Sequence, residues 1–386
     1  MSIISTQAFA YDFEVGGVYY NKSGNFATVT SGDNLYTGTV TIPATVVNGG
    51  ATYTVNAIAA KAFMNCIHLT GVNIGSNVTT IGYQAFQGCE DLEEIVIPDN
   101  VVEFGYNGGY NNHPSETFKD CTSLMSVTLG GKLASMGRDA FIGCTSLRNV
   151  TVKEGCSIIG VGCFKGCTKI AGLTIPNTVE TIDNEAFYGC TALKTIDIPA
   201  CVTAIGNMAF QGCTALTSAI VGDGVTAIGY QAFMGCTHLN TVTLGKELRT
   251  INYKAFAGCD ELKEIVIPDR VTTFGYNSGY NNHPSETFMG CISLESVTLG
   301  SKLANMGRDA FINCTSLKNV TIKDGCSYIG IGCFKGCDKI AAITIPSSVE
   351  TIDAEAFRGC TSLKTITIPE SVTSKTHIFG VFNKIV

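Results

Sequence analysis

A 23-residue pattern recurs along nearly the whole chain and constrains its fold more than any other feature. Residues 190–212, CTALKTIDIPACVTAIGNMAFQG, show it in full as C-x2-L-x2-I-x-I-P-x2-V-x2-I-G-x2-A-F-x-G. A fixed period of this length is typical of a stacked-repeat protein, in which each unit contacts mainly its neighbours. The sequence therefore predicts a solenoid. The repeat phenylalanines, each followed three residues later by a cysteine, are Phe63, Phe86, Phe118, Phe141, Phe164, Phe187, Phe210, Phe233, Phe256, Phe288, Phe311, Phe334 and Phe357.

Each repeat has three parts with different expected structures. The L-x2-I-x-I segment alternates apolar and polar residues, which predicts a strand with one buried face. The V-x2-I-G segment is long enough for a second short strand on the opposite wall. The x2-A-F-x-G segment is expected to form a single helical turn, with Ala209 and Phe210 pointing inward in the unit quoted above. The glycine before the next cysteine is expected to redirect the chain into the next strand.

Charge and composition exclude several classes of function. The net charge is -7 and no cluster of basic residues stands out, so nothing indicates nucleic-acid binding. No stretch approaches the roughly 20 apolar residues of a membrane-spanning helix. An apolar content of 45% is ample for an elongated core.

Most of the eighteen cysteines occupy one position of the repeat, so they form a column and not pairs. Cys156 and Cys326 align with the inward valine of the pattern, and Cys163 and Cys333 align with its inward alanine. Cys201 alone falls on a variable position. A buried free cysteine behaves as a small hydrophobic residue, so we expect reduced, structural thiols. No C-x2-C pair indicates zinc.

The two ends of the chain depart from the repeat. Residues 1–10 end in a small-x-small triplet that resembles the end of a secretory signal, and an ordinary flexible N-terminus is the alternative. Residues 11–59 are expected to form antiparallel strands that cap the solenoid, with a degenerate first repeat at 39–43 and a hairpin at the Asn-Gly turn that follows. Residues 60–372 are assigned to the solenoid. Residues 373–386 are expected to form a C-terminal cap through Ile378, Phe379, Val381 and Phe382.

Two repeats carry nine extra residues, since Cys89 to Cys121 and Cys259 to Cys291 are each 32 residues apart and not 23. The insertions lie in 105–118 and 275–288, exactly alike except at one of 14 positions, and their offset of 170 residues marks a duplicated block of seven units. Tyrosine and asparagine give rigid contact area and adaptable hydrogen bonds, so the insertions are candidate ligand-binding loops, with a packed structural loop as the alternative. The candidate residues are Tyr106, Asn107, Tyr110, Asn111, Asn112, His113, Tyr276, Asn277, Tyr280, Asn281, Asn282 and His283.

The strand face of the repeats offers a second candidate surface. One outward column, with one residue from each repeat, is mostly threonine, and this composition is explained by the preference of strands for β-branched residues. Its members are Asn73, Val96, Thr128, Thr151, Thr174, Asp197, Ile220, Thr243, Val266, Thr298, Thr321, Thr344 and Thr367. Arg148 is the one arginine on this face. A regular threonine array also suits a repetitive ligand.

No catalytic motif appears in the sequence. There is no nucleophile motif, P-loop or H-E-x2-H zinc motif, and the five histidines are scattered. We therefore expect no enzymatic activity, no cofactor and no metal site.

The repeat consensus closely resembles that of the BspA-like leucine-rich repeat family, also called the Treponema type, over about residues 60–372. The resemblance implies an α/β solenoid: a right-handed superhelix with a parallel concave β-sheet, short second-wall strands and single helical turns, preceded by an antiparallel β cap. Members of the family are mostly secreted or cell-surface proteins, and some are adhesins. The residues that carry the resemblance are core residues, so they identify no ligand.

These observations together predict a non-catalytic binding or adhesion scaffold that is secreted or displayed on a cell surface. Its expected partner is a host or neighbouring-cell protein. A glycan-binding surface protein, a purely structural surface spacer and an enzyme of unrecognised type are the alternatives.

Overall fold

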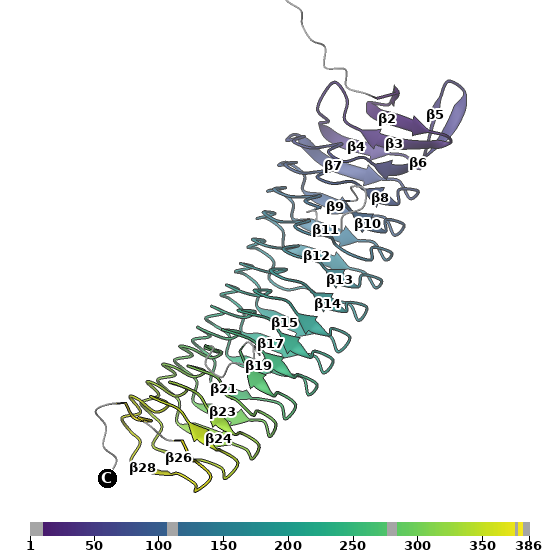
Figure 1. Ribbon diagram of the computed structural model, residues 1–386. Helices are drawn as coiled ribbons and strands as arrows, with labels where there is room; N and C mark the ends of the chain where they lie inside the picture. The colour runs from purple at the N-terminus through teal and green to yellow at the C-terminus, as the bar shows by residue number, and fades with distance from the viewer. Residues whose placement is uncertain (1–10, 106–114, 276–283, 375–376, 381–386) are drawn as a thin grey trace, which may run out of the picture. The chain divides into compact units, whose positions relative to one another are not determined.

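The structure, a computed structural model, describes residues 11–105, 115–275, 284–374 and 377–380. These residues fall into two compact units, which lie within Met1–Thr178 and Val179–Val386. Each unit is a stack of chain coils in which one coil corresponds to one sequence repeat (Figure 1). Every strand pair between successive coils is parallel, as the solenoid prediction requires.

In the first unit, one parallel sheet is formed by the L-x2-I-x-I segments. We call its outward side the strand face. Its strands are β4 (Gly38–Ile42), β7 (Leu69–Ile74), β9 (Glu94–Val96), β11 (Ser126–Leu129) and β12 (Asn149–Val152), hydrogen-bonded in that order. Isoleucine, valine and leucine side chains of these strands alternate into the core, which matches the predicted period of two.

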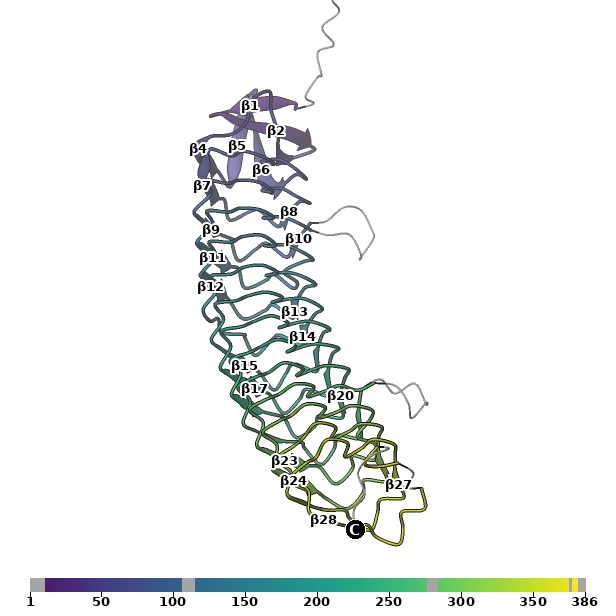
Figure 2. The ribbon, with the colours of Figure 1, turned by 90° about the vertical axis from the view of Figure 1, so that its left-hand side faces the viewer.

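The V-x2-I-G segments form the opposite side of each coil, which we call the second wall (Figure 2). Its strands in the first unit are β8 (Thr80–Ile81), β10 (Glu103–Phe104) and β13 (Ile158–Ile159). Each has two residues, and β8 pairs with β10 in parallel. The predicted second short strand is thus confirmed.

The N-terminal segment contains the expected antiparallel strands. Its elements are β1 (Phe13–Val15), β2 (Val18–Ser23), β3 (Phe26–Thr30), β5 (Thr45–Asn48) and β6 (Ala51–Ile58). The pairs β1–β2, β2–β3 and β5–β6 are antiparallel, and the last is the hairpin predicted at Asn48-Gly49. Strand β3 then pairs with β6 in parallel, and β6 pairs with β8, which joins this segment to the second wall.

The second unit repeats the same two-walled coil. Its strand-face strands are β15 (Thr195–Ile198), β17 (Ser218–Val221), β19 (Thr241–Thr243), β21 (Glu264–Val266), β23 (Ser296–Leu299), β24 (Asn319–Ile322), β26 (Ala342–Thr344) and β28 (Thr365–Thr367). Its second-wall strands are β14 (Thr181–Ile182), β16 (Ala204–Ile205), β18 (Ala227–Ile228), β20 (Thr250–Ile251), β22 (Thr273–Phe274), β25 (Tyr328–Ile329) and β27 (Thr351–Ile352).

The predicted helical turns are wrong, and with them the α/β class, because the described residues contain no helix. The x2-A-F-x-G segments are chains of tight turns. Around Phe210, the N–H groups of Met208, Phe210 and Gly212 donate to carbonyls of the next coil. Only the intervening Ala209 and Gln211 bond three residues back. A helix needs consecutive N–H groups to bond within the segment, so this alternation between two coils excludes one.

Backbone dihedral angles explain how the chain follows this path. In the same turn, Met208 has φ of 56° and Gly212 has φ of 73°, so two residues four apart adopt the left-handed conformation. The glycine before the cysteine thus redirects the chain as predicted. The residue before Ala-Phe is usually not glycine, although a left-handed residue with a side chain costs roughly 1–2 kcal/mol. The left-handed conformation turns the chain so that the phenylalanine that follows is buried, and this burial offsets the unfavourable free energy.

The repeat phenylalanines form stacks within the core of each unit. From Phe63 to Phe141, successive ring centroids lie 4.8–5.1 Å apart and the rings are within 8° of parallel. In the second unit, the spacing from Phe187 to Phe357 is 5.1–5.5 Å. The insertions leave this register intact, since Phe256 and Phe288 still stack at 5.5 Å across nine extra residues. The stacking of the core is therefore the same in these repeats as in the others.

Aromatic side chains also lie at the outer ends of the stacks. Tyr36 lies 4.5 Å from Phe63, and Phe379 lies 6.2 Å from Phe357. Ile378 is buried beside it. Val381 and Phe382, the other residues expected in a C-terminal cap, lie outside the described residues.

The cysteine column links each coil to the one before it. The thiol of Cys236 donates to the carbonyl of Phe210 at 3.2 Å, and the same contact recurs along both units at 3.0–3.3 Å. Burial raises the pKa of Cys213 and of Cys291 to about 12, so these thiols stay protonated and able to donate. Cys156, Cys163, Cys326 and Cys333 are buried as their alignment predicts, and Cys201 is half-buried.

Substitution of one repeat phenylalanine should loosen the stack locally. Phe210 is fully buried between two parallel rings, so Phe210→Ala should cost about 3–5 kcal/mol. Hydrogen exchange should show the loss in the coils next to residue 210, because stability in a solenoid propagates through nearest neighbours. Phe26→Ala is the control, since Phe26 is 49% exposed, and should change stability by less than about 1 kcal/mol. Uniform loss of protection throughout the chain would contradict this expectation.

Thiol labelling should distinguish Cys201 from the column. A maleimide reagent added to native protein should modify Cys201 first, because its sulfur is the one that is not fully buried. The other seventeen should react only after denaturation. Mass spectrometry of peptides from native, labelled protein measures this directly, and several intact disulfides would overturn the structural reading of the column.

Candidate functional site

The structure describes the residues that flank the two insertions but not the insertions themselves. We call these flanking residues, Gly105 with 115–119 and Gly275 with 284–289, the feet of the insertions. All twelve candidate residues named from the sequence fall within 106–114 and 276–283, which lie outside the described residues. In the first unit the described chain stops at Gly105 and resumes at Ser115. In the second unit the corresponding residues are Gly275 and Pro284, with Ser285 next.

The serine after each insertion fixes the chain to two neighbouring coils. Ser115 is 2% exposed, and both its N–H and its hydroxyl donate to the carbonyl of Arg138 at 2.8 Å. Its own carbonyl accepts from the N–H of Gln84 in the preceding coil. Gly105, with φ of 74°, lies so close that a Cβ atom there would be 2.4 Å from the Cβ of Ser115. The glycine is thus required where the chain leaves the coil.

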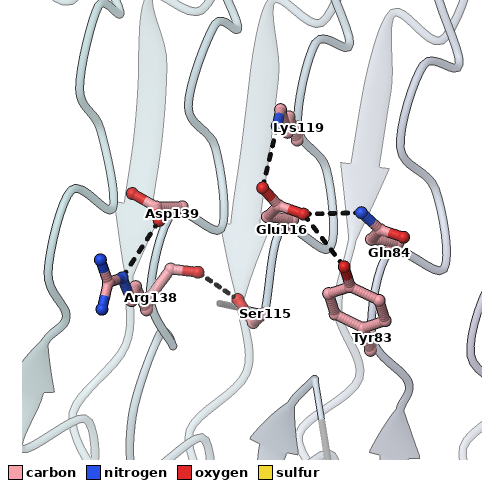
Figure 3. A network of polar contacts seen from close by, with 7 residues as sticks. All are labelled: Tyr83, Gln84, Ser115, Glu116, Lys119, Arg138 and Asp139. Atoms are coloured by element: carbon pink, nitrogen blue, oxygen red, sulfur yellow. Dashed lines mark hydrogen bonds and ion pairs between the residues drawn. The ribbon is translucent and has the colours of Figure 1, made fainter. Parts of the chain in front are cut away.

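Glu116 anchors the first foot through a polar network (Figure 3). Its carboxylate accepts hydrogen bonds from Lys119 at 2.9 Å and Gln84 at 2.6 Å, with Tyr83 at 3.4 Å. Burial raises the pKa of Glu116, but the bonds from Lys119 and Gln84 outweigh it, so the net pKa lies below its ordinary value. Glu116 is therefore charged at neutral pH and already occupied by partners within the chain.

The second foot keeps the ion pair but takes its cation from another coil. Glu286 pairs with Lys254 at 3.0 Å, and Lys254 occupies the position of Gln84. The position of Lys119 is taken by Met289. The hydrogen bonds that Lys254 donates to Tyr253 and Glu286 raise the pKa of Lys254. Both feet thus hold one charged pair, which indicates a structural role for Glu116 and Glu286 at the base of each insertion.

The strand face contains a groove in each unit, and each groove lies over a coil that carries an insertion. The groove of the first unit has a volume of about 750 Å³, and its lining includes Val96, which is 60% exposed. Its lining residues come from strands β4, β7, β9, β11 and β12 and from the segments beside them. Its lining residues are Thr39, Thr70, Gly71, Val72, Asn73, Ile74, Ser76, Glu93, Glu94, Val96, Pro98, Met125, Ser126, Arg148 and Asn149.

The groove of the second unit covers the equivalents, 170 residues later, of the part of the first groove around β7 and β9. Its volume is about 1130 Å³ and Val266, the counterpart of Val96, is 62% exposed. Its rim is closed by ion pairs of Lys246 with Asp223 and of Arg270 with Glu247. Its lining residues are Asn240, Thr241, Val242, Thr243, Leu244, Lys246, Glu247, Lys263, Glu264, Val266, Pro268, Asp269 and Arg270.

From the sequence, the column that contains these valines is interpreted as strand-filling residues, or as an array for a repetitive ligand, and the two valines are not singled out. The signal that separates them is the replacement of threonine by valine at the same place in both duplicated coils, Val96 and Val266. An outward valine exposes its apolar side chain to water, whereas an outward threonine can hydrogen-bond water through its hydroxyl. Both valines are followed by a proline, Pro98 or Pro268, at the end of the strand.

Within the described ranges, no three His, Cys, Asp or Glu side chains gather closely enough to hold a metal ion. Within the same ranges, no helix is long and apolar enough to cross a bilayer.

Comparison with solved structures finds related repeat proteins. A leucine-rich repeat protein from Bacteroides ovatus is 28% identical, covers 94% of this chain and 90% of its own, and has a TM-score of 0.66. A leucine rich cell surface protein from Faecalibacterium prausnitzii is 26% identical over 80% of this chain and 94% of its own, with a TM-score of 0.40. A T. pallidum leucine-rich repeat protein is 25% identical over 48% of this chain and 86% of its own, with a TM-score of 0.39. A comparison with curated proteins gives no match.

A sequence profile of one family also matches most of the chain. The profile describes the BspA type leucine rich repeat region in six copies, and its overlapping matches cover residues 56–167, 110–217, 157–284 and 281–380. These matches include every coil whose phenylalanine, cysteine and strand positions are described above. With its parallel coils and stacked phenylalanines, the chain belongs to the BspA-type leucine-rich repeat family.

Proposed function

We propose that this protein is a non-catalytic binding scaffold, secreted or displayed on a bacterial surface, that recognises a host or neighbouring-cell protein. The observation that carries the proposal is a coincidence within single coils. The coil of Val96 and the coil of Val266 each combine a strand-face groove with the start of an insertion. The groove lies on the strand face and the insertion starts after the second-wall strand of the same coils, so these two coils offer a ligand distinctive chemistry on both walls.

The repeat motif itself supports a scaffold and not an enzyme. Its phenylalanines, cysteines and alanines are fully buried and bonded to neighbouring coils, so they stabilise the fold and cannot reach a substrate. The grooves are open and lined by strand residues, with the charged groups at their rims paired to each other in the second unit. Leucine-rich repeat proteins commonly use such extended surfaces for binding.

The insertions support a protein partner through their composition. Tyrosine contributes large contact area at low conformational-entropy cost, and asparagine contributes adaptable hydrogen bonds. The feet at Ser115 and Ser285 are buried and bonded to two coils each, so the loops start and end at fixed points. The same aromatic and amide groups suit sugar rings, which makes a glycan the second candidate partner.

A binding panel separates the candidate functions. Purified protein is tested against immobilised host matrix proteins and a glycan array, together with a variant in which both insertions are shortened to the ordinary 23-residue spacing. Protein binding that needs the insertions supports the proposal, and glycan binding that needs them favours the second candidate. Binding to neither, by folded protein, favours a structural spacer. Thermal unfolding of the shortened variant checks that loss of binding is not loss of fold.

Tyrosine substitutions should weaken binding in two steps. Tyr106→Ala with Tyr110→Ala should reduce affinity for the captured protein, and adding Tyr276→Ala with Tyr280→Ala should reduce it further. On a multivalent surface the combined loss should exceed the sum, since two weak sites on one chain gain avidity. Surface plasmon resonance at high and low ligand density measures this difference. Tyr188→Ala is the control outside the insertions, and unchanged binding by the quadruple variant would make the insertions structural.

A further inference from the structure

Three positions that lie side by side on successive coils differ between the first groove and the equivalent strand face of the second unit, where Lys263 alone of the three lines the groove. In the first unit these positions hold Glu93, Met125 and Arg148. The N–H of Met125 donates to the carbonyl of Glu93 at 2.8 Å, and that of Arg148 donates to Met125 at 3.1 Å. The three residues are therefore held in one row across the strand face.

The second unit has the same row with different charges. Lys263, Glu295 and Lys318 are joined by backbone bonds of the same lengths, 2.8 and 3.1 Å. The Lys318 ammonium lies 2.7 Å from the Glu295 carboxylate, and this bond, with Lys263 nearby, holds the pKa of Glu295 below its usual range. In this row a carboxylate lies between two cations. It forms an ion pair with Lys318, and the charge of Lys263 also stabilises it.

Methionine breaks the corresponding series in the first unit. Met125 is half-buried, and it stands between exposed Glu93 and exposed Arg148. Among the described residues, neither of these two forms an ion pair. The first groove thus presents a free guanidinium and a free carboxylate on either side of an apolar surface that Met125 shares with Val96. Arginine and methionine are enriched at protein interfaces, where arginine often dominates the binding energy.

The spacing of the row defines the segment that would complement it. Neighbouring strands lie about 4.8 Å apart, so two steps across the strands separate Glu93 from Arg148 by about 10 Å. A segment extended in the polyproline II conformation has three residues per turn and rises about 3.1 Å per residue, so side chains three residues apart lie on one side of it, about 9 Å apart. A neutral sugar would leave both charges unpaired, whereas a peptide can satisfy each of them.

We propose that the first groove binds an extended segment of another protein in which an acidic and a basic side chain lie three residues apart with apolar side chains between them. The acidic group pairs with Arg148, the basic group pairs with Glu93, and the apolar groups cover Met125 and Val96. This rests on the proposed function as a protein-binding scaffold and names the chemistry of the bound segment.

The test uses capped peptides and a probe inside the groove. The full chain is labelled with ¹³C at its methionine methyl groups, and the signal of Met125 is assigned by its absence from Met125→Leu. A peptide with an Asp-Val-Ile-Lys block should shift this signal in a saturable way. The matched peptide with Asn-Val-Ile-Gln should bind at least about fivefold more weakly, the factor expected for loss of an exposed ion pair. Arg148→Gln should weaken the charged peptide similarly, whereas Lys318→Gln in the second unit should not.

Exchange of row residues between the two units should abolish peptide binding in the first unit and create it in the second. Met125→Glu should pair with Arg148 as Glu295 pairs with Lys318, and should abolish most of the peptide response. Lys263→Glu combined with Glu295→Met should give the second unit the same order of carboxylate, methionine and cation, with Lys318 in the place of Arg148, and a new methionine methyl signal should then respond to the peptide. These surface substitutions leave the core intact, and unchanged thermal unfolding checks this.

Several results would overturn the inference. They are equal binding of the charged and amide peptides, no effect of Arg148→Gln, or a glycan that shifts the Met125 signal when no peptide does. Each leaves the scaffold function to the protein and glycan panel, because that panel uses whole proteins and variants of the insertions. Failure of the row and failure of the scaffold proposal are thus distinguishable.

Discussion

The hydrogen bonds that each turn donates to the next coil hold the rest of the structure in register. Because alternate N–H groups around Phe210 point to the next coil, successive coils cannot slide or rotate relative to each other. The phenylalanine rings then stack at about 5 Å, as in the pair Phe210 and Phe233 at 5.1 Å. A left-handed residue such as Met208 destabilises the fold by roughly 1–2 kcal/mol, while burial of one phenylalanine side chain stabilises it by about 1.5–3 kcal/mol. The buried ring therefore offsets the unfavourable turn conformation.

A consequence of this arrangement is that the repeat motif leaves little for function. The phenylalanine ring lies in the stack and its carbonyl accepts a hydrogen bond from a thiol of the next coil, as Phe210 does from Cys236. What distinguishes one coil from another lies in departures from the pattern: a valine in a threonine column, a methionine in a row of charges, or nine extra residues after a second-wall strand. These departures concentrate in the duplicated coils of Val96 and Val266.

Much of this fold follows from the sequence, because period and burial are both written in the repeat. The strands at Leu193 to Ile198, the second-wall strand near Ile205 and the buried phenylalanines could all be predicted from apolar spacing. The helical turn could not, since its alanine and phenylalanine fit a helix equally well and the left-handed residue before them is often an ordinary one such as Met208. The grooves also escaped prediction. The exposure of Val96 and the lack of an ion-pair partner for Arg148 depend on the side chains of neighbouring coils. The sequence of a single repeat does not contain this information.

The exchanged cation at the insertion feet has a consequence for how the two copies of the block can change. Glu116 is neutralised by Lys119 on its own coil, and Glu286 by Lys254 on the preceding coil. A genetic crossover between the copies, with its junction between the positions of Gln84 and Glu116, yields one product with two lysines beside the carboxylate and a reciprocal product with none. Junctions outside the interval between Gln84 and Lys119 keep one lysine for each carboxylate. Recombination between Gln84 and Lys119 therefore leaves the carboxylate with two lysines or with none. The ion pair favours variants in which the glutamate and its lysine come from the same copy.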